Sequence, residues 1–115
     1  MVINESSKEY IDVNDGLARM GGNASLYKRL LGRFVDGNHY NDLDGAIQSG
    51  NLEEAAQHAH TIKGVSANLS LIKIASLSTD LEQALKAGSD FTILNTELKQ
   101  AYDATVDLIA ELNGQ

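Results

Sequence analysis

The 115-residue chain contains no cysteine, no proline and no tryptophan, and aromatic residues make up only 5% of it. Without cysteine, it can form neither disulfides nor cysteine-ligated metal sites. No apolar run approaches the roughly 18–20 residues that are needed to span a bilayer. The first ten residues, MVINESSKEY, also lack the basic start and apolar stretch of a signal peptide. We therefore expect a cytoplasmic protein that makes no membrane contact.

Positive charge is also scarce. Nine lysine and arginine residues face sixteen aspartates and glutamates, which gives a formal net charge of −7. A nucleic-acid-binding protein needs a basic face, so this balance argues against a nucleic-acid partner. Hydrophobic residues make up 43% of the chain, and its length suits a single core. We expect one domain over residues 1–115, and we expect it to be monomeric.

Apolar residues recur at spacings of three and four, the period of amphipathic helices. The last such stripe comprises Phe91, Leu94, Leu98, Ala101, Thr105, Leu108 and Leu112. A second comprises Leu71, Ile74, Leu77 or Ser78, Leu81 and Leu85, and a third comprises Leu52, Ala55, Ala59, Ile62, Ser66 and Leu69. These stripes predict three amphipathic helices that bury one face each.

The first half of the chain adds two further segments of helical period. Residues 24–49 show this period, but Gly32, Gly37 and Gly45 predict a kink or short break near DGNH at 36–39. Residues 14–23 predict a short helix followed by a glycine turn. Because the predicted loops have two to four residues, neighbouring helices must be antiparallel. The predicted fold class is all-α: an antiparallel, up-down-up-down four-helix bundle with a short additional N-terminal helix.

Capping residues mark where two of these helices begin. Asn51 precedes one helix, and Glu54 follows three residues later, as in a capping box. Ser70 stands where an N-cap is expected for the next helix.

The helix around residue 60 has an unusual second face. Because each residue turns about 100°, Ile62 in the buried stripe lies about 160° from His60. His60 instead shares a face with Ala56, Gln57, Lys63, Gly64 and Ala67. A glycine inside a helix costs roughly 0.5–1 kcal/mol relative to alanine. The face is consistent either with an ordinary solvated surface or with an exposed nucleophile that another protein docks against.

Metal and hydrolase sites are poorly supported. His58 and His60 are two residues apart and point to different faces, whereas helical metal pairs need spacings of three or four. His39 is remote in sequence. No serine lies in a hydrolase motif, and no glycine-rich loop could hold a nucleotide phosphate. We expect neither a metal nor a cofactor.

The motifs HTIKG (60–64), VSANL (65–69) and LEQALKAG (81–88) resemble the histidine-containing phosphotransfer (HPt) domain of multistep phosphorelays. The upstream segment IDVNDGLARMGGNASLYKRLLGRF is also similar to this family, and the resemblance covers roughly residues 11–110. It implies a phosphoryl carrier without its own ATP or metal site, not an enzyme. The implied partners are receiver domains, of separate response regulators or of a hybrid sensor kinase, and these supply the Mg²⁺.

The resemblance also implies roles for individual residues. His60 would be the phosphoacceptor, which takes the group from a receiver aspartate and passes it to another receiver. Glu82 matches the family's acidic or amide position and would hold the proton on Nδ1 of His60. Lys63 would neutralise phosphoryl charge, and Gln57 would add a hydrogen bond. Gly64 and Ala67, with Ala56, would leave room for the docking receiver.

One departure and two alternatives accompany this interpretation. The family usually has glycine where this chain has Ser70, and we expect the turn to form nevertheless. One alternative is the dimerisation and phosphoacceptor domain of a sensor kinase, whose histidine is usually followed directly by an acidic residue. Thr61 occupies that place here. The other alternative is a helical adaptor bundle that transfers no phosphate.

Overall fold

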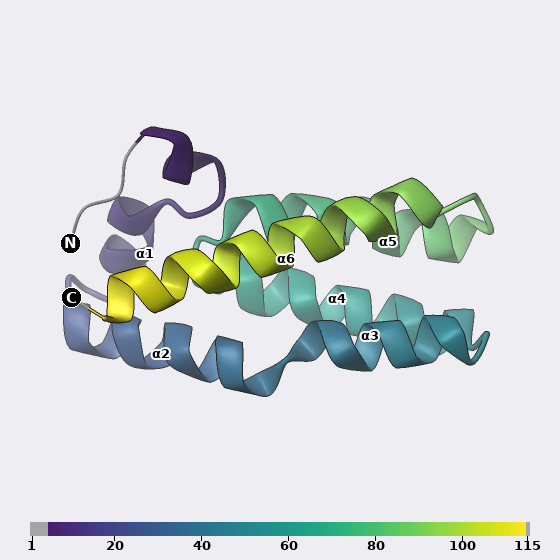
Figure 1. Ribbon diagram of the computed structural model, residues 1–115, viewed down its shortest axis with the longest axis horizontal. Helices are drawn as coiled ribbons and strands as arrows, with labels where there is room; N and C mark the ends of the chain where they lie inside the picture. The colour runs from purple at the N-terminus through teal and green to yellow at the C-terminus, as the bar shows by residue number, and fades with distance from the viewer. Residues whose placement is uncertain (1–4, 115) are drawn as a thin grey trace.

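A computed structural model of the chain describes residues 5–114 (Figure 1). The described residues contain helices and turns, without a β-strand. The elements are η1 (Glu5–Glu9), α1 (Val13–Arg19), α2 (Ala24–Gly37), α3 (His39–Gln48), α4 (Leu52–Asn68), α5 (Ile72–Ala87) and α6 (Thr92–Asn113). The all-α prediction is confirmed. None of these helices is long and apolar enough to cross a bilayer.

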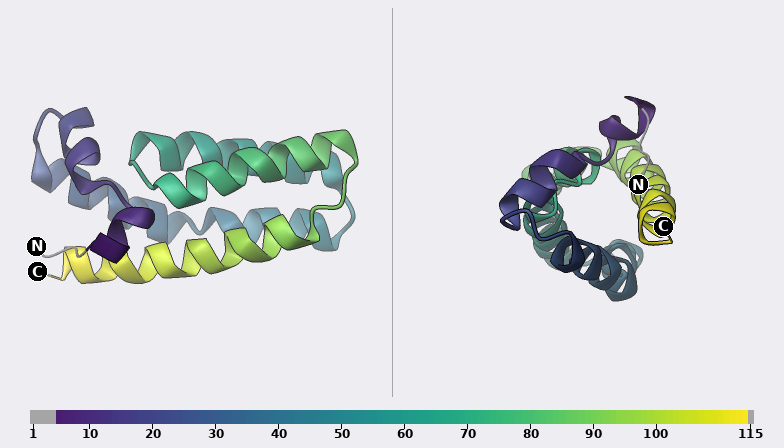
Figure 2. Two further views of the ribbon diagram at one scale, coloured as in Figure 1. Left: turned by 90° about the horizontal axis from the view of Figure 1, so that it is seen from above. Right: turned by 90° about the vertical axis from the view of Figure 1, so that its left-hand side faces the viewer.

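The helices form an elongated bundle with extents of 41 × 23 × 21 Å (Figure 1). The bundle has four antiparallel arms, each formed by one long helix or by two helices placed end to end. Helices α2 and α3 together form the first arm, and α4, α5 and α6 form the other three (Figure 2). The chain reverses direction between successive arms, and α3 contacts α4, α4 contacts α5, and α5 and α2 contact α6. Helix α1 lies across one end. The predicted up-down-up-down bundle with an additional short helix is therefore confirmed.

The break predicted at residues 36–39 lies at Asn38, between α2 and α3. Asn38 has a left-handed backbone conformation with φ of 45°, which ends one helix and starts the next. Asparagine tolerates this conformation better than most side chains. The backbone N–H of His39, which the break frees, donates to the hydroxyl of Tyr102 on α6 at 3.1 Å. The first arm is thus broken but stays fixed to the bundle.

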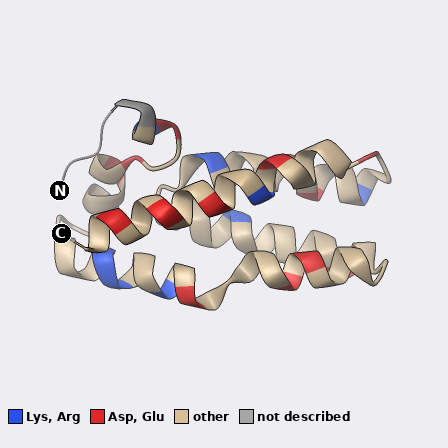
Figure 3. Ribbon diagram, viewed as in Figure 1, with Lys and Arg blue, Asp and Glu red and all other residues tan. Residues whose placement is uncertain are grey.

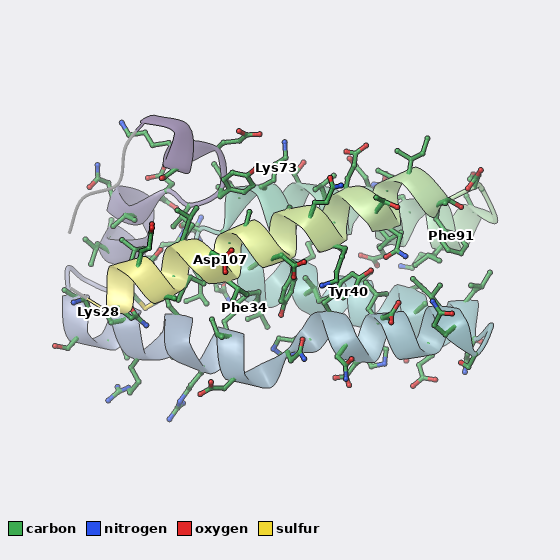
Figure 4. All side chains as sticks on the ribbon, viewed as in Figure 1. Lys28, Phe34, Tyr40, Lys73, Phe91 and Asp107 are labelled. Carbon is green, nitrogen blue, oxygen red and sulfur yellow. The ribbon has the colours of Figure 1, made fainter. Side chains whose placement is uncertain are left out.

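An aromatic cluster fills the space between this first arm and α6. The rings of Phe34 and Tyr40, labelled in Figure 4, lie 5.2 and 5.9 Å from the ring of Tyr102. The hydroxyl of Tyr40 donates to Asn95 at 2.8 Å. These contacts hold α6 along both halves of the broken arm.

At the end of the bundle, α1 packs against α2 at Gly16. A Cβ on Gly16 would overlap the ring of Tyr27, so only glycine permits this close approach. The Tyr27 hydroxyl, fully buried, donates to the backbone carbonyl of Leu69 at 2.7 Å. The N-terminal helices are therefore tied to the end of α4.

The predicted cap at Asn51 is confirmed. Its side chain accepts from the N–H of Glu54 at 3.1 Å and donates to the Glu54 carboxylate at 3.0 Å. The prediction for Ser70 is wrong, because the N-cap of α5 is Leu71 and it makes no side-chain capping bond. Ser70 instead has a φ of 57°, and its hydroxyl donates to the carboxylate of Asp15 on α1. The turn forms, and Ser70 joins it to α1.

The predicted apolar stripes meet in one core, and one of their residues is not buried as predicted. Leu52 was expected to be buried but is 38% exposed, because it opens the first turn of α4 at the end of the bundle. Small residues dominate the rest of the α4 stripe, and Ala55, Ala59 and Ser66 are fully buried. Small side chains let helix backbones approach closely, and α4 has its most extensive contact with α5. This close packing fixes α5 against α4.

Candidate functional site

His60 is presented on the outer side of α4. Its side chain is 65% exposed, whereas Ile62 on the opposite side of the helix is fully buried. The orientation follows from the helical period, as expected. The imidazole is therefore accessible to another protein on one edge, and the other edge faces α5.

Glu82 on α5 supplies the group that faces His60. Both carboxylate oxygens lie 3.2 Å from Nδ1 of the imidazole. The Glu82 side chain is only 8% exposed. An ionised carboxylate only accepts hydrogen bonds, so Nδ1 must be the donor. The neutral ring then carries its proton on Nδ1 and keeps a free lone pair on Nε2.

Two lysines complete the surroundings of this carboxylate. Nζ of Lys86, one turn later on α5, lies 2.7 Å from Oε2, and Nζ of Lys63 on α4 lies 3.8 Å from Oε1. The Lys86 hydrogen bond, assisted by that of His60, holds the pKa of Glu82 below its usual value against the opposing effect of burial. Glu82 is thus a carboxylate at neutral pH although it is buried.

A hollow of about 760 Å³ opens beside His60, between α4 and α5. Its lining includes Ala56, Gln57 and His60 from α4, and Glu82, Leu85 and Lys86 from α5. Gln57 was predicted to lie on the same face of the helix as His60, and in the structure it lines this hollow. Ala56 was expected on the open face, but it is only 5% exposed and contributes to the packed base of the hollow. The expectation of an open position is therefore wrong, because Ala56 lies at the packed side of α4, which contacts α5 and α3.

Gly64 and Ala67 continue the exposed face beyond His60. A Cβ added to Gly64 would meet no atom within 4 Å, and its backbone φ lies outside the left-handed region. Neither packing nor backbone conformation in this chain requires a glycine at this position. The surface one turn after His60 is open.

The other two histidines lie in different surroundings. His58 pairs with Glu54 on its own helix, with Nε2 3.4 Å from Oε1. The ring of His39 packs against Phe34 at 5.9 Å. Within residues 5–114, no group of three or more histidine, aspartate or glutamate side chains could hold a metal ion. Of the three histidines, His60 alone contacts a buried carboxylate.

Lys86 was not among the residues predicted for this site from the sequence. Its spacing of four from Glu82, with the acid first, is the favourable arrangement for a helical ion pair and was visible in LEQALKAG. The spacing could not show that the acid is buried, which is what distinguishes this pair from the exposed pairs on other helices.

The comparisons identify the family. A sequence model described as the Hpt domain matches residues 37–112, which is about two thirds of the chain and contains α3 to α6 with His60, Lys63 and Glu82. The match begins later than the resemblance noted from the motifs, which extended upstream to residue 11. No curated protein and no solved structure matches the chain.

Proposed function

The chain belongs to the Hpt domain family, whose members carry phosphoryl groups in phosphorelays and exchange them with receiver domains, and on this premise we propose that His60 is the phosphoacceptor. It takes the group from a receiver aspartate and passes it to the aspartate of another receiver. One observation carries the assignment: His60 is 65% exposed, and its Nδ1 is bound to a buried carboxylate that leaves Nε2 free. This arrangement suits nucleophilic attack through Nε2.

In the proposed step, the Nε2 lone pair attacks the phosphorus of the aspartyl phosphate. The bond between phosphorus and the aspartate oxygen breaks, and its electron pair stays on the receiver's carboxylate. The ring, still protonated on Nδ1, becomes a phosphoimidazolium, and Glu82 stabilises its positive charge. In the onward step, the aspartate of the next receiver attacks phosphorus and the electron pair of the P–N bond returns to Nε2.

Lys63 and Gln57 have supporting roles. Nζ of Lys63 is 3.8 Å from Glu82, too long for a strong hydrogen bond, and the side chain is 36% exposed. Lys63 can therefore turn to the phosphoryl oxygens without giving up a strong contact. Gln57 lies one turn before His60 and supplies an amide that can donate to the same oxygens. Gly64 and Ala67 provide clearance for the receiver.

A transfer assay tests this proposal. The domain is incubated with a panel of phosphorylated receivers, and we expect it to gain acid-labile, base-stable phosphate. His60→Gln should abolish the uptake, whereas His58→Gln, two residues away on another face, should leave it unchanged. Uptake by the His60→Gln variant would contradict the assignment. If no receiver phosphorylates the wild-type domain, the adaptor interpretation would be favoured instead.

A further inference from the structure

The ion pair between Lys86 and Glu82 lies on the α5 side of the hollow beside His60. We propose that Lys86 is a positioning residue, which holds the Glu82 carboxylate against Nδ1 and thereby keeps the Nε2 lone pair of His60 available. The inference rests on the proposed function of His60 and deepens it. It assigns to Lys86 an action through Glu82 and not through the phosphoryl group.

The distances show which contact fixes the carboxylate. Oε2 of Glu82 is 2.7 Å from Lys86, shorter than the 3.2 Å to Nδ1 and the 3.8 Å from Oε1 to Lys63. The Lys86 contact is in the range of strong charge-assisted hydrogen bonds, and the other two are not. The orientation of the carboxylate is therefore set mainly from the Lys86 side.

The burial of Glu82 distinguishes this pair from an ordinary surface ion pair. Exposed pairs contribute little, because water solvates both charges when the pair opens. The Glu82 side chain is only 8% exposed, so its charge depends on protein partners, while Lys86 is 65% exposed and reaches it from the rim. Among the residues whose exposure is described, Glu82 is the one buried residue with a charged side chain.

The charged groups that face Glu82 lead to the same conclusion. His60 and Lys63 approach from α4 and Lys86 from α5, and Glu53 also lines the hollow. The Lys86 hydrogen bond is the largest influence that lowers the pKa of Glu82, and burial opposes it. Without Lys86, this carboxyl group would bind a proton more readily or turn towards solvent. Either change weakens its hold on the Nδ1 proton.

The test measures the tautomer of His60 directly. Long-range ¹H–¹⁵N spectra of the unphosphorylated domain are recorded at about pH 8.5, well above the ordinary imidazole midpoint. We expect the Nδ1–H form to dominate in the wild type. In Lys86→Gln, the ratio of the Nδ1–H to the Nε2–H form should fall by roughly three- to tenfold, as expected when a charge-assisted hydrogen bond is lost. Lys86→Arg should largely preserve the ratio.

Two comparisons make the result decisive. Lys73→Gln removes a lysine from the other end of α5, where its partner is the exposed Glu9, and should leave the ratio unchanged. In a Glu82→Gln background, Lys86→Gln should add no further change. A wild-type ratio in Lys86→Gln, or an undiminished effect in the Glu82→Gln background, would overturn the proposal. The readout needs no phosphate, so failure of transfer to His60 would leave this result separately interpretable.

Discussion

Gly64 lies one turn from His60, and the fold itself does not explain why a glycine occupies this position. Because a Cβ there meets no atom, Gly64→Ala and Gly64→Gln should both stabilise the domain, by about 0.5–1 kcal/mol for alanine. If the glycine serves docking, Gly64→Gln should also slow transfer from a receiver, because its side chain occupies the space beside His60. Thermal unfolding and transfer rates measured on one preparation test both expectations.

Gly45 offers a matched control for this substitution. It also lies within a helix, α3, and a Cβ there likewise meets no atom within 4 Å. Gly45→Gln should therefore raise the melting temperature without slowing transfer. A Gly64→Gln variant that transfers at the wild-type rate would remove the clearance argument and leave the role of His60 untouched.

Glu82 should make the stability of the domain depend on pH. Its pKa is lowered from the usual 4.5 by the hydrogen bond from Lys86 and, to a smaller extent, by that from His60. A lowered pKa means that Glu82 contributes its full stabilisation above about pH 4.5 and loses it as the pH falls through the folded-state value. Urea unfolding between pH 7 and pH 3 should therefore show a steeper acid loss in the wild type than in Glu82→Gln. Parallel curves for the two proteins would refute this assignment.

At the scale of elements, the turn between α4 and α5 depends on Ser70. Its left-handed φ of 57° costs a non-glycine residue roughly 1 kcal/mol, while its hydroxyl bond to Asp15 partly compensates. Ser70→Ala loses the bond and keeps the strain, whereas Ser70→Gly loses the bond and relieves the strain. We expect the alanine variant to be less stable than the glycine variant by about 1 kcal/mol.

Urea unfolding of the two Ser70 variants measures this difference. The hydrogen bond from Ser70 is also the largest influence that lowers the pKa of Asp15. Both variants should therefore raise the Asp15 pKa, which NMR titration of its carboxyl group can follow. Equal stability of the alanine and glycine variants would mean that the backbone of this turn is not strained.

The helices themselves could be predicted from the sequence, because a period of three and four residues over ten or more positions has few alternatives. The exceptions lie where one helix meets another. Ser70 became a link to Asp15 instead of a cap, because its role depends on α1, which is 55 residues away in the chain. Leu52 was predicted to be buried, because a stripe of apolar residues does not show where the bundle ends, but it is exposed in the first turn of α4. Ala56 was predicted to be open, but it is buried where α4 packs against its neighbours.

The same limit applies to the candidate site. The HTIKG motif and helical geometry were enough to predict an exposed His60 with Lys63 and Gly64 beside it. The family pattern also pointed to Glu82. The sequence could not reveal that Glu82 is a buried carboxylate held by Lys86, because burial depends on how α4 and α5 pack together.

At the scale of the whole molecule, charge is unevenly distributed. Residues 16–35 contain four basic residues and no acidic one, whereas the rest of the chain carries all sixteen acidic residues and five basic ones. Figure 3 shows, by the colour of the ribbon, basic residues on α2 and a row of acidic residues along α6. Helix α2, with three basic residues and one acidic residue, is thus a positive element of a negative protein. The expectation of a monomer stays a prediction.

We propose that Nε2 of His60 carries the phosphoryl group while Nδ1 keeps its proton against Glu82. The most direct measurement is an NMR spectrum of the ¹⁵N-labelled domain after phosphorylation by a receiver, in which coupling to ³¹P identifies the bonded nitrogen. We predict coupling to Nε2 of His60, with Nδ1 still protonated. A phosphoryl group on Nδ1, on His39 or on His58 would contradict the account.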